Sequence, residues 1–242
     1  MSDITPFLLP GVHASPNIQK APDIYEIENC AADPDHSIER VMATLASWHD
    51  KIVLDLGAGT GFHLARFHES AAHVFAVEPH DPSRLRAMAR VAAAGLTRTS
   101  ILTGSAEQIL LPDKSVDMIH ARFAYFFAPD CEPGLQEVAR VIRPEGTVFI
   151  IDNDLRTGTF ASWVRCSPWV GSTTPDEVEQ FWAHHGFTLH RIASEWRFQS
   201  RADLEAVVSI EFPGELARQI LHEHQGTSVE YHYCLYSRQY EG

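Results

Sequence analysis

Apolar and polar positions follow two alternating periods along the chain from residue 51 onward. Short apolar runs predict strands over residues 52–56, 73–79, 99–104, 116–121 and 147–152. Helical spacing and helix start signals predict helices after residue 61 and over 81–96, about 133–142 and 174–185. This alternation of strand and helix is typical of an α/β fold with a mostly parallel sheet.

The last third of the chain departs from this simple alternation. Residues 187–198 and 229–239 predict two late strands, with a helical insertion over 201–225 between them. Residues 1 to about 35, the loop 155–172 and the insertion do not build the sheet. We expect them to act as lids or to line a substrate pocket, although the insertion could equally well only cover the sheet.

The size of the chain predicts one domain. With 242 residues and 45% hydrophobic content, the chain can bury a substantial core. We divide it into an N-terminal cap with the first helices (1–50), a cofactor-binding core (51–152) and a substrate-side part (153–242). The last part holds the loop, the late strands and the insertion.

Charge and cysteine content exclude several classes of partner. The chain has 19 Lys and Arg against 32 Asp and Glu, a net charge of −13 without a long basic run, which argues against a nucleic-acid partner. Its four cysteines form no CxxC pair, and the paired histidines lack further metal ligands, so we expect reduced thiols and no metal. No signal peptide or long apolar run is present, which predicts a cytoplasmic protein with no membrane partner.

The segment KIVLDLGAGTG, residues 51–61, is the most informative part of the chain. Its apolar run predicts a strand buried on both faces, followed directly by a turn with Gly57, Gly59 and Gly61. Glycines allow a sharp turn and let a ligand approach the main chain closely. Strand, turn and helix together predict a ligand crevice at the carboxyl end of the strand.

Two residues narrow the class of ligand. The dinucleotide fingerprint GxGxxG requires a small residue at position 62, where Phe62 stands, and no Walker-type lysine is present. Glu78 ends the second predicted strand, 21 positions after Gly57 (78 minus 57). A carboxylate at this place accepts hydrogen bonds from both hydroxyls of a ribose without a 2′-phosphate.

Four motifs, in this order, carry a family resemblance: VLDLGAGTG, AVEP, GSAEQILLPDKSVDMI and LQEVARVIRPEGTVFI. Over roughly residues 51–152 the chain resembles class I S-adenosylmethionine-dependent methyltransferases, in particular the group that acts on small molecules. The resemblance implies a doubly wound, Rossmann-like sheet of seven strands, six of them parallel and the last, VEYHYCLYS, antiparallel. N-terminal and late helices would cover it.

The resemblance also implies which residues contact the methionine part of the cofactor. Asp55 would order the glycine turn, and Gly57, Ala58 and Gly59 would lie with their backbone close to the amino-acid moiety and the ribose. Tyr25, in the segment DIYEIEN, resembles an N-terminal tyrosine that reaches the carboxylate of the cofactor in some relatives. A packed helix aromatic is the alternative for Tyr25.

The adenosine part would contact residues after the second and third strands. Glu78 would bind the ribose hydroxyls and Pro79 would pack near the adenine. Ser105, Ala106 and Glu107 match the family segment that contacts the adenine. Ser105 departs from the usual acidic residue, but its hydroxyl can still accept a hydrogen bond. Glu107 could instead hold the turn that follows it.

The implied reaction requires mainly alignment of a nucleophile with the methyl group of the sulfonium. His120, after the fourth strand, is the best candidate for cofactor contact or for a general base, and a buried, hydrogen-bonded histidine is the alternative. His222 and His224 are weaker candidates. An aromatic set could line the acceptor pocket or form core: Phe123, Tyr125, Phe126, Phe127, Trp163 and Trp169.

The sequence therefore predicts transfer of a methyl group from S-adenosylmethionine to a small-molecule acceptor, with release of S-adenosylhomocysteine. Two alternatives stay open: a protein that binds the cofactor without catalysis, and an NAD-dependent oxidoreductase. The segment HARFAYFF replaces the Asn-Pro-Pro-aromatic signature of many nucleic-acid methyltransferases, which further disfavours RNA or DNA as the acceptor. A monomer and a homodimer are both compatible with the sequence.

Overall fold

A computed structural model describes residues 9, 12, 14–168 and 171–241. The helices are α1 (Pro16–Lys20), α2 (Pro22–Ala31), α3 (Ser37–Leu45), α4 (Leu64–His68), α5 (Asp81–Ala93), α6 (Glu132–Val141), α7 (Thr159–Arg165), α8 (Pro175–His184), α9 (Arg201–Glu211) and α10 (Gly214–Glu223). The strands are β1 (Ile52–Leu56), β2 (His73–Val77), β3 (Thr99–Leu102), β4 (Val116–Arg122), β5 (Ile142–Asn153), β6 (Thr188–Ile192), β7 (Glu195–Arg197), β8 (Ser228–Glu230) and β9 (Tyr233–Gln239).

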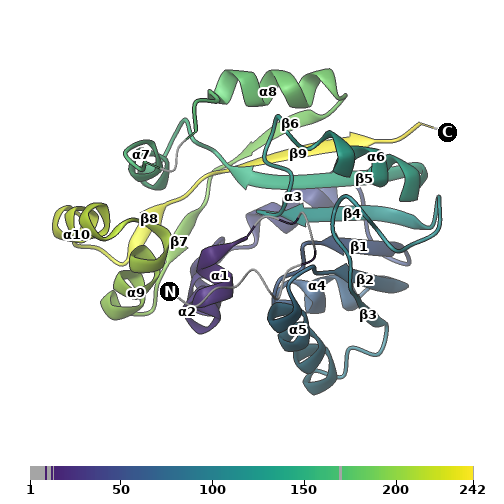
Figure 1. Ribbon diagram of the computed structural model, residues 1–242, viewed down its shortest axis with the longest axis horizontal. Helices are drawn as coiled ribbons and strands as arrows, with labels where there is room; N and C mark the ends of the chain where they lie inside the picture. The colour runs from purple at the N-terminus through teal and green to yellow at the C-terminus, as the bar shows by residue number, and fades with distance from the viewer. Residues whose placement is uncertain (1–8, 10–11, 13, 169–170, 242) are drawn as a thin grey trace.

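Seven strands form the main sheet in the order β3-β2-β1-β4-β5-β9-β6 (Figure 1). Neighbouring strands from β3 to β5 are parallel, whereas β9 is antiparallel to both β5 and β6. Six strands therefore run in one direction and β9 runs against them. This confirms the predicted doubly wound sheet with one antiparallel strand.

The sheet is buried on both faces because neighbouring residues of its central strands are apolar. Val53 and Leu54 are both fully buried, and since they point to opposite faces they belong to two different apolar clusters. The cluster around Val53 includes residues of α3 and α4. The cluster around Leu54 includes residues of α6 and α8. Helices thus cover both faces, as a parallel sheet requires.

The late part of the chain is more divided than the sequence predicts. The segment 187–198 breaks at Ala193 and Ser194 into β6 and β7, and the segment 229–239 is divided into β8 and β9. The strands β7 and β8 pair in a separate two-stranded sheet. The insertion consists of α9 and α10, separated near Pro213, and the predicted loop 155–172 contains α7.

The N-terminal helices lie beside the late helices although they are far apart in sequence (Figure 1). Asn17 Nδ2 donates to Glu211 Oε1 at 2.6 Å, and Ala32 forms an isolated bridge with Trp196. These contacts place α1 and α2 near the small sheet and α9. Among the described residues, no helix combines the length and the apolar content that spanning a membrane requires.

Asp33 ties the N-terminal helices to the late strands. Its fully buried carboxylate accepts hydrogen bonds from the backbone N–H groups of Ser37 and Ile38 at 3.0 and 2.9 Å, and from Ser194 Oγ at 2.6 Å. Asp33→Ala leaves these donors without a partner and is expected to lower the free energy of unfolding by about 2–4 kcal/mol. Thermal denaturation should show a fall in Tm of roughly 5–15 °C.

Asp35→Ala is the matched control for this prediction. The Asp35 side chain is 61% exposed and faces Arg197 across 3.3 Å, so its removal should change the free energy of unfolding by less than about 1 kcal/mol. Equal losses for the two variants would show that Asp33 does not link the two parts of the chain.

Candidate functional site

The glycine turn after β1 is held against the end of β2. The backbone N–H groups of Gly57 and Ala58 donate to the carbonyl of Val77 at 2.9 and 3.1 Å. Gly57, Gly59 and Gly61 all have positive φ angles, of +80°, +56° and +78°. Since other residues adopt these angles only with strain, the three glycines are what allows the chain to turn here.

Glu78 joins the turn to the end of β2. Its Oε2 accepts a hydrogen bond from the Gly59 N–H at 2.8 Å, and its Oε1 accepts one from the His80 N–H at 2.8 Å. Burial raises the pKa of Glu78, although the two backbone donors partly oppose that shift. The side chain is only 7% exposed. The carboxylate therefore has a fixed position beside the glycine turn.

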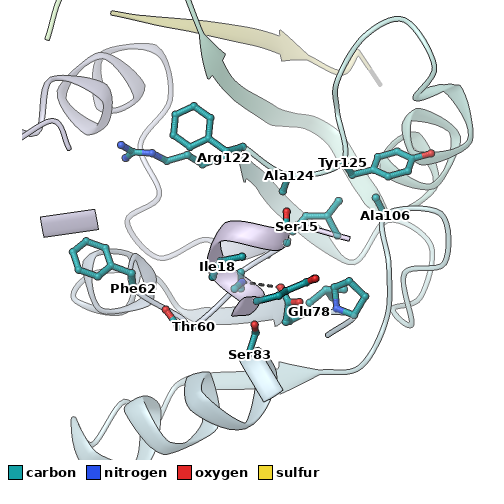
Figure 2. Close-up of a pocket in the computed structure, with 18 of the residues that line it drawn as sticks. Ser15, Ile18, Thr60, Phe62, Glu78, Ser83, Ala106, Arg122, Ala124 and Tyr125 are labelled. Atoms are coloured by element: carbon teal, nitrogen blue, oxygen red, sulfur yellow. Dashed lines mark hydrogen bonds between the residues drawn. The ribbon is translucent and has the colours of Figure 1, made fainter. Parts of the chain in front are cut away.

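A cavity of about 360 Å³ lies at the carboxyl ends of β1, β2 and β4. The first residue after each of these strands lines its wall: Gly57, Glu78 and Phe123. Figure 2 shows Ser15 and Ile18 lying across this wall, near Thr60 and Glu78. The cavity therefore occupies the place where parallel α/β sheets bind ligands, and the N-terminal segment covers it.

Most of the predicted cofactor residues line this cavity. They are Tyr25, Gly57, Ala58, Gly59, Glu78, Pro79, Ser105, Ala106 and Glu107. They come from several places in the sequence, and the fold brings them together. Glu107 also accepts a hydrogen bond from the hydroxyl of Tyr125 at 2.9 Å. Burial and this bond raise the pKa of Tyr125 to about 12, so Tyr125 keeps its proton at neutral pH.

Asp55 and His120 lie elsewhere, under the turn. They are register partners on β1 and β4, and His120 Nδ1 lies 2.8 Å from Asp55 Oδ1. Both are buried, and neither is among the residues that line the cavity. The His120 ring packs against Phe67, with 5.0 Å between the ring centroids. His120 thus has the buried, hydrogen-bonded arrangement, and contact of either residue with a cofactor stays a prediction.

Several cavity residues were not singled out from the sequence, and two of them, His63 and Glu28, are titratable. His63 lines the wall beside the glycine turn, and its Nδ1 is buried without a hydrogen bond among the described residues. Burial, with a smaller effect of Arg122, holds the pKa of His63 well below its usual value, so it is neutral at pH 7. Glu28 lies three residues after Tyr25 on α2 and lines the cavity too. That helical spacing was the available signal for Glu28.

Arg122 brings a buried positive charge to the cavity. Its side chain is 5% exposed and lies 3.8 Å from Glu39 Oε1. The guanidinium also lies over the rings of Phe123 and Tyr233, 5.6 and 5.5 Å from their centroids. A buried arginine held in this way keeps its charge and its orientation.

The three segments predicted as lids differ in their placement. The N-terminal segment lines the cavity from Val12 to Ala32, whereas no described residue of 155–172 or 201–225 does. Among the predicted aromatic residues, Phe123, Tyr125 and Phe127 line the cavity and Phe126 is in the core, and Trp163 packs on Phe212 and His224. Trp169 lies outside the described residues. His222 and His224 do not line the cavity.

Comparison with known proteins shows what the chain is similar to. Residues 54–150 match the family described as "Methyltransferase domain". An uncharacterized methyltransferase of Mycobacterium tuberculosis is 41% identical over 115 residues, which are 47% of this chain and 43% of that protein. The match thus spans less than half the length of that curated relative.

Solved structures show the same fold over most of the chain. The YcgJ protein of Bacillus subtilis superposes with a TM-score of 0.64 at 19% identity, covering 86% of this chain and 99% of that one. A protein of Aquifex aeolicus described as a SAM dependent methyltransferase superposes with a TM-score of 0.56 at 20% identity, covering 89% and 96%. At these identities the likeness shows the fold.

Proposed function

We propose, from the match of residues 54–150 to the family described as "Methyltransferase domain", that the protein transfers a methyl group from S-adenosylmethionine to a small-molecule acceptor. The observation that carries the proposal is the position of Glu78 in the cavity wall, fixed to the glycine turn. S-Adenosylhomocysteine would be the second product.

The ribose end of the cofactor fits the residues that are present. Each oxygen of Glu78 accepts one backbone N–H, and a carboxylate oxygen has a second acceptor position. Glu78 can therefore accept both hydroxyls of a ribose without losing its hold on the turn. Gly57 and Gly59 leave their main-chain atoms open to the cavity because they have no Cβ.

The adenine end fits the opposite part of the same wall. Pro79 and Ala106 offer apolar surface, and Ser105 offers a hydroxyl that can accept a hydrogen bond from an exocyclic amine. The hydrogen bond between Tyr125 and Glu107 fixes the edge of this part. These residues support binding of an adenosine. At position 105 the contact with the adenine amine would come from a hydroxyl and not from a carboxylate.

When bound, S-adenosylmethionine supplies an electrophilic methyl group, so the protein has mainly to align the acceptor and exclude water. Alignment of two reactants can lower the activation barrier by roughly 7–11 kcal/mol. The buried Arg122 and the rings beside it give this end of the cavity a fixed shape. His63, which is neutral at pH 7, could receive a proton from a hydroxyl acceptor.

The size and the cover of the cavity support a small acceptor. Its volume of about 360 Å³ is within the range of small-molecule sites, roughly 300–1,000 Å³. The N-terminal segment lies across it, and the net charge of −13 opposes a nucleic-acid acceptor. The four cysteines are all free thiols, which supports a reducing, cytoplasmic environment.

Ligand-dependent thermal denaturation tests the cofactor. S-Adenosylmethionine or S-adenosylhomocysteine at about 100 times its Kd adds roughly 2.7 kcal/mol of stability. For a chain of this size we expect a rise in Tm of roughly 5–11 °C. NAD should give no rise, because Phe62 occupies the position at which the dinucleotide fingerprint needs a small residue. A rise with NAD alone would contradict the proposal.

A second measurement separates an enzyme from a protein that only binds the cofactor. Incubation with S-adenosylmethionine and a panel of acceptors should release S-adenosylhomocysteine in proportion to methylated product. Cofactor binding with no turnover for any acceptor would favour the non-catalytic alternative.

A further inference from the structure

One wall of the cavity carries an acidic group that the cofactor contacts do not use. Glu28 on α2 lines the cavity, and its Oε2 is buried with no hydrogen-bond partner among the described residues. Its neighbour is Glu211, the last residue of α9, whose Oε1 accepts a hydrogen bond from Asn17 Nδ2 at 2.6 Å. Two helices distant in sequence thus bring two carboxyl groups together.

Burial disfavours the charged form of both carboxyl groups. Burial and the proximity of Glu211 raise the pKa of Glu28 well above its usual value, and burial also raises the pKa of Glu211. The hydrogen bond between them requires a proton on one partner. Because two carboxylates this close do not both ionise readily, the pair keeps at least one proton and carries at most one negative charge.

The ionised form of this pair has no cationic partner of its own in the described part of the chain. No Lys or Arg of the described part of the chain forms an ion pair with Glu28 or Glu211. Arg122 approaches from the end of β4 and lowers the pKa of Glu28, but its nearest carboxylate is Glu39, which also forms an ion pair with Arg66. A buried, unpaired charge at a cavity wall is costly unless a ligand neutralises it.

Aromatic rings surround the same end of the cavity. Tyr25, Phe123 and Tyr231 line it together with Glu28. The rings of Phe123 and Tyr231 are stacked, with 6.3 Å between their centroids, and the hydroxyl of Tyr231 donates to Asn153 Oδ1. Burial raises the pKa of Tyr25 and of Tyr231 well above 10, so both stay neutral. Ring faces beside a carboxylate attract cations.

We propose that the methyl acceptor is an amine, and that Glu28, supported by Glu211 and enclosed by Tyr25, Phe123 and Tyr231, binds its nitrogen. This inference rests on the proposed methyltransferase function. An ammonium group beside the unpartnered Glu28 Oε2 would stabilise the ionised form of the pair. A hydroxyl supplies no such counter-charge, and a carboxylate would be repelled by it. The preference for nitrogen therefore follows from the charge of the wall.

The proposed step balances as a displacement at carbon. The lone pair of the neutral amine nitrogen forms a bond to the methyl carbon, and the bond between that carbon and sulfur breaks with its electron pair going to sulfur. The sulfonium becomes a neutral thioether, and the nitrogen becomes a methylated ammonium. Before this displacement, the ionised Glu28–Glu211 pair takes one proton from the ammonium of the bound acceptor, which frees the lone pair of the nitrogen. The methylated product leaves as an ammonium, and the pair returns its proton to solvent.

Matched sets of ligands test the preference directly. An amine, an alcohol and a carboxylate are compared on butyl, cyclohexyl and phenylethyl skeletons, first as ligands of the protein saturated with S-adenosylhomocysteine. We expect the amines to raise Tm more than the alcohols on the same skeleton, and the carboxylates to raise it least. The proposal would be overturned if, on each of the three skeletons, the amine raised Tm no more than the alcohol did.

Glu28→Gln tests the residue. It keeps the size and hydrogen-bonding capacity of the side chain but removes its charge. We expect kcat/KM for the best amine to fall on the order of 100-fold, as for loss of a proton acceptor. The Kd for S-adenosylhomocysteine should change by less than about threefold, below 1 kcal/mol. The control is Glu205→Gln, since Glu205 lies on α9 with a side chain 51% exposed and pairs only with Arg201.

The pH dependence of the rate separates a proton acceptor from a structural residue. The titratable and charged groups that face Glu28 are Tyr25 on its own helix, Glu211 from α9, Arg122 from β4, Tyr231 before β9 and Tyr233 on β9. Glu211→Gln removes the neighbouring charge that raises the pKa of Glu28. The acid limb of the kcat/KM profile should therefore move to lower pH, whereas an unmoved limb would overturn the role of the pair.

The outcomes distinguish this proposal from the function on which it rests. If neither S-adenosylmethionine nor S-adenosylhomocysteine binds, the methyltransferase proposal itself fails. If both bind but alcohols are methylated faster than amines, only the amine preference fails. If Glu28→Gln weakens cofactor binding and leaves the amine preference intact, Glu28 holds the ammonium of the cofactor instead, and the acceptor assignment is wrong.

Discussion

Glu78→Ala is expected to weaken the binding of S-adenosylhomocysteine by at least about 100-fold. Glu78 is the one buried carboxylate that both lines the cavity and is fixed to the glycine turn among the described residues. Hydrogen bonds to a charged group contribute about 1.5–3 kcal/mol each. Loss of two such bonds to ribose hydroxyls therefore costs about 3–6 kcal/mol, or a factor of roughly 100 to 10,000 in Kd.

The same substitution also loosens the empty site. The N–H groups of Gly59 and His80 lose their acceptor, and an unsatisfied buried donor costs about 1–3 kcal/mol. We therefore expect a lower Tm in the absence of ligand as well as weaker binding. Glu78→Gln keeps an acceptor oxygen for one of the donors and should lose less stability than Glu78→Ala.

Calorimetric titration with S-adenosylhomocysteine measures the affinity, and denaturation without ligand measures the stability. Glu69→Ala is the control, because Glu69 is an exposed residue after α4 and does not line the cavity. An affinity equal to that of the unchanged protein would remove the ribose assignment of Glu78. It would leave only a structural role for the carboxylate.

The sheet and the glycine turn could be predicted because local pattern determines them. Strands such as β1 are apolar at almost every position, and so short an apolar run bounded by a glycine turn is typical of a strand buried on both faces. The late strands were harder because their ends depend on distant partners. Ser194, where the predicted strand breaks, donates its hydroxyl to Asp33, 161 positions earlier. No local pattern reveals such a contact.

The residues of the candidate site also fall into a group that could be predicted from the sequence and a group that could not. Residues that follow strands, such as Glu78 and Ser105, were predictable because the carboxyl ends of parallel strands meet at one edge. Glu28 was not predicted. Its spacing from Tyr25 was the only local signal, and its place in the cavity also depends on how α2 packs against α9. The family resemblance places Asp55 and His120 near the cofactor. In the structure their side chains contact each other, and their contact with a cofactor stays a prediction.

Gly57→Ala is expected to have the largest effect of any single added methyl group in this site. A Cβ at position 57 would lie 2.3 Å from the Cβ of Ala124, and the residue has a φ of +80°. Ala124 belongs to the loop after β4, so the clash forces the glycine turn and that loop apart. The backbone strain costs about 1–2 kcal/mol and the overpacking typically about 1–3 kcal/mol more.

Gly95→Ala separates the two contributions. Gly95 has a φ of +63° with no atom within 4 Å of an added Cβ, so this variant has the strain without the clash and should lose only about 1–2 kcal/mol. The double variant Gly57→Ala with Ala124→Gly removes the clashing Cβ and should recover the overpacking part of the loss. Thermal denaturation with and without S-adenosylhomocysteine measures both stability and binding. Because the cavity wall includes Gly57 and Ala124, the double variant should recover binding together with stability. Equal Tm values for Gly57→Ala and Gly95→Ala would show that the glycine turn and the loop after β4 do not constrain each other.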